Sequence, residues 1–208
     1  MGHSHQAFFK ESFVDEVADA AGQDALAFRL SLLKNHPRHA KVLQTVAEKS
    51  AWKNTAYKAP DGSQRAMGLA LHESFGSIVA QVAEVSVLQQ TIRVHRVWCV
   101  IDCGTAVNPD LIAQQMEGSV AFALSAAFFG RIQLNKGRVQ QSNFHDYQVL
   151  RLPDMPPVET FIMPSDAIPE GVGEPGTPPV APAVANAVFT LTGQRLRSLP
   201  FALAATTV

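Results

Sequence analysis

The sequence has no marked excess of charge of one sign and no long apolar run. Its 208 residues include 17 Lys and Arg against 18 Asp and Glu, and no dense basic cluster occurs. Nucleic acids and anionic membrane surfaces are bound by basic patches, so the composition favours neither partner. No uncharged apolar stretch reaches the roughly 18 residues that span a bilayer, and the N-terminus lacks a signal-peptide pattern. We therefore expect a cytoplasmic protein, or a periplasmic one if a signal lies on another segment or on a partner.

Cysteine is also scarce. Cys99 and Cys103 both fall within the β-branched stretch "VHRVWCVIDCGTAV". A strand there would separate their Cα atoms by roughly 13 Å, which is too far for a disulfide. No second cysteine pair or nearby His completes a metal site. Both thiols are expected to be structural, and no residue of the chain is assigned as a metal ligand.

Apolar residues are plentiful, at 47%, so the chain can bury a substantial core. In its first part they recur at helical spacing in three stretches. The expected helices are residues 6–22, 24–35 and 37–52. Residues 53–66 are polar and rich in turn formers. They are expected to link a helical segment, 1–52, to the remaining domain, 67–208.

From residue 67 the pattern becomes typical of strands. The expected strands are 67–87 and 91–102, as an antiparallel pair, then 131–135, 138–142 and 158–164. A helix is expected at 109–129, with Asn108 as its cap and Pro109 in its first turn. A last helix should end near Leu191. Because helices and strands mix without regular βαβ alternation, the sequence predicts an α+β fold.

The segment "GVGEPG", residues 171–176, places one carboxylate, Glu174, among three glycines and a proline. If the next helix begins at Pro178 or Pro179, the prolines fall in or near its first turn, where N–H groups lack helical partners. The loop would then be stiffly held, and its glycines would let other groups approach the carboxylate, as a catalytic acid or base requires. The alternative is a solvated acid in a turn-rich loop.

Several segments together resemble one enzyme family. They are "LHESFGSIVAQVAEVSV", "HRVWCVIDCGTAVNPDLIAQQMEGSVAFALSAAFFG", "SNFHDYQVL" and "GVGEPGTPPVAPAVANAVFTLTGQRLRSLPF". In this order they resemble the C-terminal part of the large molybdenum-binding subunit of bacterial isoquinoline 1-oxidoreductase and related aldehyde dehydrogenases. These enzymes belong to the xanthine oxidase family of molybdenum hydroxylases. The resemblance covers essentially the whole chain.

The resemblance implies roles for individual residues. Glu174 corresponds to the active-site base beside the molybdenum, and Gly173 precedes it at the cofactor. Gln115, in "QQMEG", corresponds to a glutamine that hydrogen-bonds the pyranopterin. Two alternatives stay open: Gln114 could take this place in the motif, or Gln115 could be a polar residue on a helix surface.

The N-terminal "GHSHQ" resembles a turn beside the family's cofactor pocket, which implies that Gly2 and His3 lie near the cofactor. His72 and Glu73, in "HESFGS", could suggest an acid/base pair. Neighbours on a strand face opposite ways, however, so the two side chains should not act together.

The family also implies cofactors and partners. The expected cofactor is a molybdenum pyranopterin, in the form of molybdopterin cytosine dinucleotide, and iron–sulfur clusters are expected on a small 2Fe–2S partner subunit. Family subunits are several times longer, and no "MGQG"-like pterin loop occurs here. The missing N-terminal portion of the large subunit is therefore a further expected partner.

These implications lead to one predicted function and one alternative. The chain would be the base-bearing C-terminal portion of an enzyme that oxidises an N-heteroaromatic compound or an aldehyde with oxygen from water. The alternative is a non-catalytic remnant or assembly domain that binds partner chains without turnover.

Overall fold

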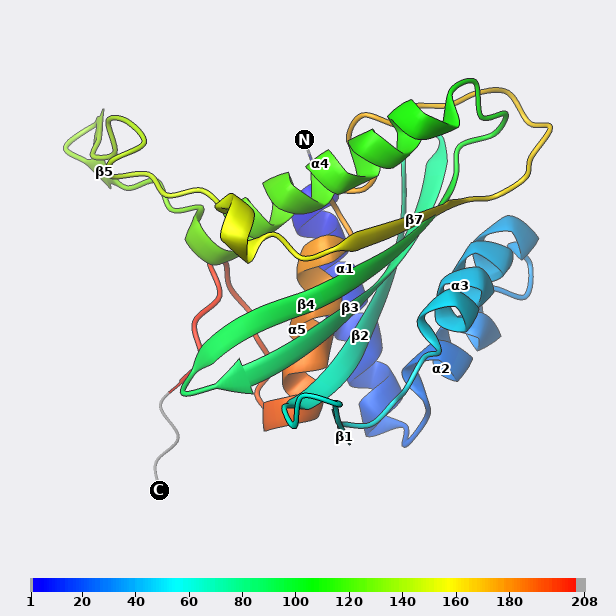
Figure 1. Ribbon diagram of the computed structural model, residues 1–208, viewed down its shortest axis with the longest axis horizontal. Helices are drawn as coiled ribbons and strands as arrows, with labels where there is room; N and C mark the ends of the chain where they lie inside the picture. Colours follow the sequence, from blue (N-terminus) through cyan, green and yellow to red (C-terminus); the bar gives the residue numbers. More distant parts are fainter. Residues whose placement is uncertain (1, 205–208) are drawn as a thin grey trace.

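Helices and strands are mixed along the chain in a computed structural model that describes residues 2–204 (Figure 1). The helices are α1 (His3–Ala20), α2 (Ala25–Leu32), α3 (Pro37–Ser50), α4 (Pro109–Phe129) and α5 (Val180–Thr192), with a 3-10 turn at Leu152–Asp154. The strands are β1 (Tyr57–Lys58), β2 (Gln64–Ser74), β3 (Ser77–Leu88), β4 (Thr91–Asp102), β5 (Leu134–Asn135), β6 (Arg138–Val139) and β7 (Val158–Ile162). This α+β arrangement confirms the predicted fold class.

The main sheet has five strands in the order β1, β2, β3, β4, β7. The first four are antiparallel neighbours, and β7 pairs parallel to β4 at the far edge. β5 and β6 form a separate hairpin around Lys136 and Gly137, within the expected strands 131–135 and 138–142 but shorter than them. β7 therefore lies next to β4 before the chain continues toward the 171–176 loop.

The long strand expected at 67–87 was wrong. A two-residue turn at Phe75 and Gly76, with φ of 54° and 77°, joins β2 to β3, and Ser74 pairs with Ser77. Such turns match the twist of antiparallel strands. β2 also begins at Gln64, within the stretch expected to be a linker. Most residues of both strands are buried on both faces, so the strands lack the alternation of apolar and polar residues that marks a half-buried strand.

The sheet is covered on both faces (Figure 1). On one face α1, α4 and α5 pack on a core that includes Ala70, Ala83 and Val97. On the other face α2 and α3 pack on Leu69, Val82 and other residues of alternate parity. The N-terminal helices thus share cores with the strands. The proposed division at residues 52 and 67 stays a prediction.

The start of α4 follows the expected capping chemistry, whereas the start of α1 does not. Asn108 Oδ1 accepts the N–H of Leu111 at 3.0 Å, and Pro109 lies in the first turn of α4. α1, however, begins at His3 with Gly2 as its N-cap, so the predicted "GHSHQ" turn is a helical turn instead. Its residues are polar and mostly exposed, so no apolar residues recur there at the spacing that predicts a helix.

Within residues 2–204, no helix combines the length and apolar character needed to cross a membrane.

Candidate functional site

The 171–176 loop is fastened to the sheet and to α4 by side chains that donate to its carbonyl oxygens. Ser77 Oγ donates to Gly171 O at 2.7 Å, and Gln81 Nε2 donates to Gly176 O at 2.8 Å. Ser119 Oγ, on α4, donates to Gly173 O at 3.2 Å. These three bonds hold the loop on both sides of Glu174. The predicted stiffness is therefore built largely by residues far away in the sequence.

The loop also packs too closely on α4 for a larger residue. A Cβ added at Gly176 would lie 2.8 Å from Ser119 Cβ and 3.0 Å from Met116 Sδ. The following helix begins at Val180, with Pro179 as its N-cap, one residue later than the range expected. Prolines in and before this first turn carry no N–H, so fewer backbone donors there need a partner.

A cavity of about 400 Å³ opens beside this loop. Glu174 and Gly173 of the loop line it together with Gln115 of α4 and His3 of α1. Residues far apart in the chain, predicted from separate motifs, therefore meet at one cavity. Phe75, in the β2–β3 turn, adds an apolar wall.

Not every residue considered for cofactor binding lines this cavity. Gln115 lines the cavity and Gln114 is not among its lining residues. Gly2 is outside the lining as well and serves as the cap of α1. The Glu174 side chain is exposed, so this chain alone does not shield its carboxylate from water.

A histidine pair lies next to the cavity and was not predicted. His72 Nε2 is 3.1 Å from His3 Nδ1, and the His72 side chain is buried on β2. Glu73 faces the other way and contacts His39 at 2.8 Å, as expected for neighbours on a strand. The pair was missed because 69 residues separate its members.

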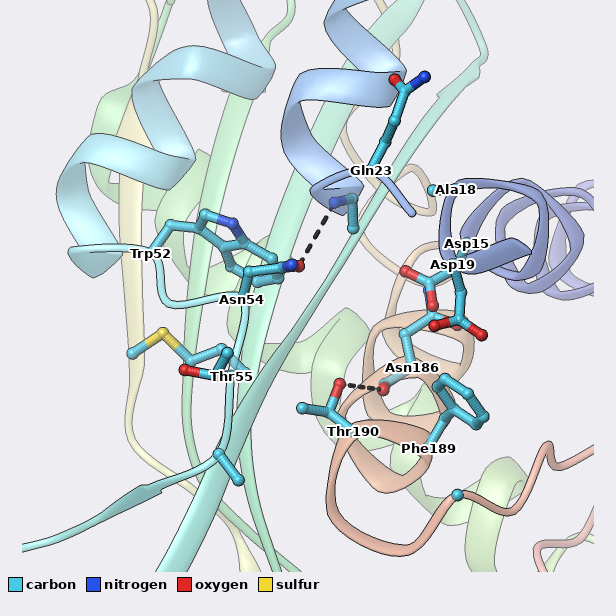
Figure 2. Close-up of a pocket in the computed structure, with 14 residues that line it drawn as sticks. Asp15, Ala18, Asp19, Gln23, Trp52, Asn54, Thr55, Asn186, Phe189 and Thr190 are labelled. Carbon is cyan, nitrogen blue, oxygen red and sulfur yellow. Dashed lines mark hydrogen bonds between the residues drawn. The ribbon is translucent and has the colours of Figure 1, made fainter. Parts of the chain in front are cut away.

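A second cavity, of about 390 Å³, lies between α1, α5 and the segment 52–56, at the opposite end of the sheet (Figure 2). Figure 2 shows Asp15 and Asp19 of α1 facing Asn186 and Phe189 of α5. Asp15 is held in ion pairs by Arg29 at 3.5 Å and by Arg195 at 2.6 Å. None of the predicted site residues lines this cavity. Its charged groups tie α1 to α2 and to the segment that follows α5, so the first cavity is the better functional candidate.

Comparisons with known proteins identify the family of the chain. The family model described as "Molybdopterin cofactor-binding domain" matches residues 12–156, well over half of the chain. The chain belongs to this family.

Curated relatives extend the match. The domain is 41% identical to isoquinoline 1-oxidoreductase subunit beta of Brevundimonas diminuta over 202 residues, which are 96% of this chain and 26% of that protein. It is 32% identical to membrane-bound aldehyde dehydrogenase [pyrroloquinoline-quinone] of Gluconacetobacter polyoxogenes, over 91% of this chain and 27% of that protein. The chain thus spans about a quarter of the length of these relatives.

A solved structure supports the fold. Reconstituted CO dehydrogenase from Oligotropha carboxidovorans matches with a TM-score of 0.52 and 22% identity, over 59% of this chain and 17% of that one. The two curated relatives are an oxidoreductase and a dehydrogenase by name.

The cysteines of this molybdopterin cofactor-binding domain are free and buried, as predicted. Burial raises the pKa of the Cys99 thiol to about 12, so it stays protonated and unreactive. Across residues 2–204, no three His, Cys, Asp or Glu side chains gather closely enough to hold a metal ion.

Proposed function

We propose that this domain is the base-bearing portion of a molybdenum hydroxylase that oxidises an N-heteroaromatic compound or an aldehyde with oxygen from water. The observation that carries the proposal is the meeting of Glu174, Gln115 and His3 at one cavity. The three residues were predicted from three different segments of the sequence. Their position around one cavity therefore supports the proposal. Glu174 is the proposed catalytic base.

The residues present fit one side of a molybdenum pyranopterin. A Cβ added at Gly173 or Gly118 would meet no heavy atom within 4 Å, so both glycines border open space. The Gln115 amide and the Ser4 hydroxyl supply hydrogen-bonding groups at the same cavity. We propose that Gln115, Gly173 and His3 contact the cofactor in its cytosine dinucleotide form. The cofactor would supply the two-electron oxidation and activate a water-derived oxygen.

The chain's own groups would then position and move a proton. Glu174 would accept a proton at its carboxylate from the oxygen that is transferred to the substrate. The bonds from Ser119 and Gln81 to neighbouring carbonyls would keep that carboxylate aimed at the cavity. Phe75 and Phe122 would offer an apolar surface to the substrate's ring or alkyl group.

The partners belong to the same proposal. Because Glu174 is exposed here, an enclosed site needs further protein, and the proposed source is the remaining portion of a large subunit. A small subunit with 2Fe–2S clusters would remove the electrons. We place the assembled enzyme in the cytoplasm, with the periplasm as the alternative.

The names of the relatives leave two substrate classes, isoquinoline-type heteroaromatics and aldehydes. One name also specifies pyrroloquinoline quinone, whereas the family model that matches this chain is for molybdopterin. Metal analysis of the assembled protein decides between these cofactors. A cofactor-free complex would favour the non-catalytic alternative, an assembly domain without turnover.

Glu174→Gln tests the catalytic assignment directly. The substitution keeps the size of the side chain and removes its ability to accept a proton. In the assembled, molybdenum-loaded enzyme we expect kcat to fall about 10²- to 10⁴-fold with isoquinoline or an aromatic aldehyde as substrate. The molybdenum content should stay unchanged, because the assigned role is proton transfer and not ligation.

Glu170→Gln is the matched control, since Glu170 is an exposed acid just ahead of the loop and does not line the cavity. Its kcat should stay within about twofold of wild type, as for surface substitutions generally. Near-normal turnover of a fully loaded Glu174→Gln enzyme would refute the base assignment. Loss of molybdenum from that variant would assign Glu174 to cofactor binding instead.

A further inference from the structure

His72 is a buried polar side chain with an incomplete set of partners. It is 7% exposed, and its Nε2 lies 3.1 Å from Nδ1 of His3. Its other ring nitrogen, Nδ1, is buried and has no hydrogen-bond partner within residues 2–204. Each neutral imidazole carries one N–H and one bare nitrogen, so the state of this pair is a choice between two arrangements.

The surroundings keep His72 neutral. Burial, followed by the positive charge of Lys10 and the ring of His3, lowers the pKa of His72 to about 4. Glu11 of α1 and Glu73 on its own strand act in the opposite direction but more weakly. At neutral pH the His72 ring therefore carries a single proton, which must sit on either Nε2 or Nδ1.

The buried Nδ1 decides between these positions. If His3 donated to His72, the His72 proton would sit on Nδ1 as a buried N–H without a partner. If His72 donates from Nε2, Nδ1 is only a bare acceptor. Orphaned buried donors are the rarer of the two in folded proteins, because an unsatisfied N–H loses its whole hydration.

We propose that His72 is a positioning residue that donates its Nε2–H to Nδ1 of His3 and thereby fixes the His3 proton on Nε2. His3 then presents a fixed N–H donor at the cavity of Glu174, whose lining includes His3. Within residues 2–204 no hydrogen bond occupies His3 Nε2. A fixed donor selects a ligand with an acceptor atom, which is an oxygen or an unprotonated ring nitrogen. The choice of ligand by His3 rests on the proposed function, whereas the position of the protons on His3 and His72 does not.

Magic-angle-spinning NMR of the 15N-histidine-labelled chain tests the tautomer without any turnover. The 15N shifts separate protonated from bare ring nitrogens, and His72→Gln and His3→Gln identify the two residues by loss of their signals. We expect both rings to carry the proton on Nε2 near neutral pH. A proton on Nδ1 of His72 would overturn the proposal.

Two His72 variants then test whether His72 controls His3. His72→Gln retains an amide N–H donor and should keep His3 as the Nε2–H form. His72→Phe removes the donor and should let His3 adopt a mixture of tautomers. An unchanged His3 spectrum in folded His72→Phe would overturn the positioning role. If His72→Phe fails to fold, the wild-type spectrum and His72→Gln still decide the matter.

His3→Phe in the molybdenum-loaded enzyme identifies which acceptor the N–H serves. Removing a substrate contact should raise KM for isoquinoline roughly three- to tenfold with full molybdenum content. Removing a cofactor contact should lower molybdenum content at unchanged KM of the loaded fraction. If neither quantity changes, His3 does not bind at the cavity and the ligand part of the proposal fails. The NMR outcome would stand even if the enzyme were no hydroxylase.

Discussion

At the scale of single residues, His72 makes the stability of the domain depend on pH. The pKa of His72 falls from 6.5 to about 4 on folding, mainly because the ring is buried. Between these values the unfolded chain binds a proton that the folded domain does not. Stability therefore rises with pH in this window and is lost as pH falls from about 6.5 toward 4.

We expect this one group to remove about 2 to 3 kcal/mol of unfolding free energy between about pH 7 and pH 4. Urea unfolding of wild type and His72→Gln across this range measures the effect. The unfolding free energy of the variant should change less with pH, by that amount. His95, whose pKa is also lowered by burial, contributes equally to both proteins. Identical curves for the two proteins would show that His72 is not held neutral by the fold.

Individual residues could be singled out from the sequence where a local motif surrounds them. Glu174 stands out because glycines and prolines surround it, and Asn108 because Pro109 follows it. Gln81 offered only a weak signal, one amide in an apolar strand, and the carbonyl that it bonds lies 95 residues away. Partners at such distances are set by the tertiary fold, so hydrogen-bond pairs of this kind do not show in a single sequence.

At the scale of elements, α5 depends on a glycine beneath it. A Cβ added at Gly68, on β2, would overlap the backbone atoms Ala183 O and Ala187 N of the helix. Because backbone cannot rotate away as a side chain can, Gly68→Ala should destabilise the domain by about 2 kcal/mol or more. Thermal unfolding measures the loss.

Gly118→Ala is the matched control for that substitution. Gly118 lies within α4, and an added Cβ there meets no heavy atom within 4 Å. Alanine should stabilise the helix by about 0.5 to 1 kcal/mol. The two Gly→Ala variants should therefore shift the melting temperature in opposite directions. A neutral Gly68→Ala would mean that α5 does not pack so closely on β2.

Helices were predictable where a proline or a capping residue marks their start. Pro37 marks the start of α3 and Asn108 caps α4, and both helices lie where expected. The turn at Phe75 and Gly76 was missed because a phenylalanine with positive φ gives no turn signal. The parallel pairing of β7 with β4 could not be read either, since 55 residues lie between the two strands.

At the scale of the whole molecule, the domain leaves large aromatic side chains uncovered. Phe9 and Phe13, on α1, are 61% and 64% exposed. They border a groove of about 480 Å³ whose other side is formed by Leu196 and Arg197. Monomeric proteins rarely leave large contiguous apolar patches in water. In the proposed enzyme the rest of the large subunit would cover surface of this kind.

We therefore expect the isolated chain to self-associate and to bind a hydrophobic dye. The double variant Phe9→Ser/Phe13→Ser should shift sedimentation toward monomer and lower dye fluorescence several-fold, because it removes most of the exposed aromatic area on α1. Phe144→Ser is the control, since Phe144 is 70% exposed but does not line that groove. Equal effects of both changes would mean that exposure in general, and not the α1 groove, drives association. A wild-type chain that stays monomeric at high concentration and binds no dye would show that this surface is stable in water, and the argument for a covering partner would fail with it.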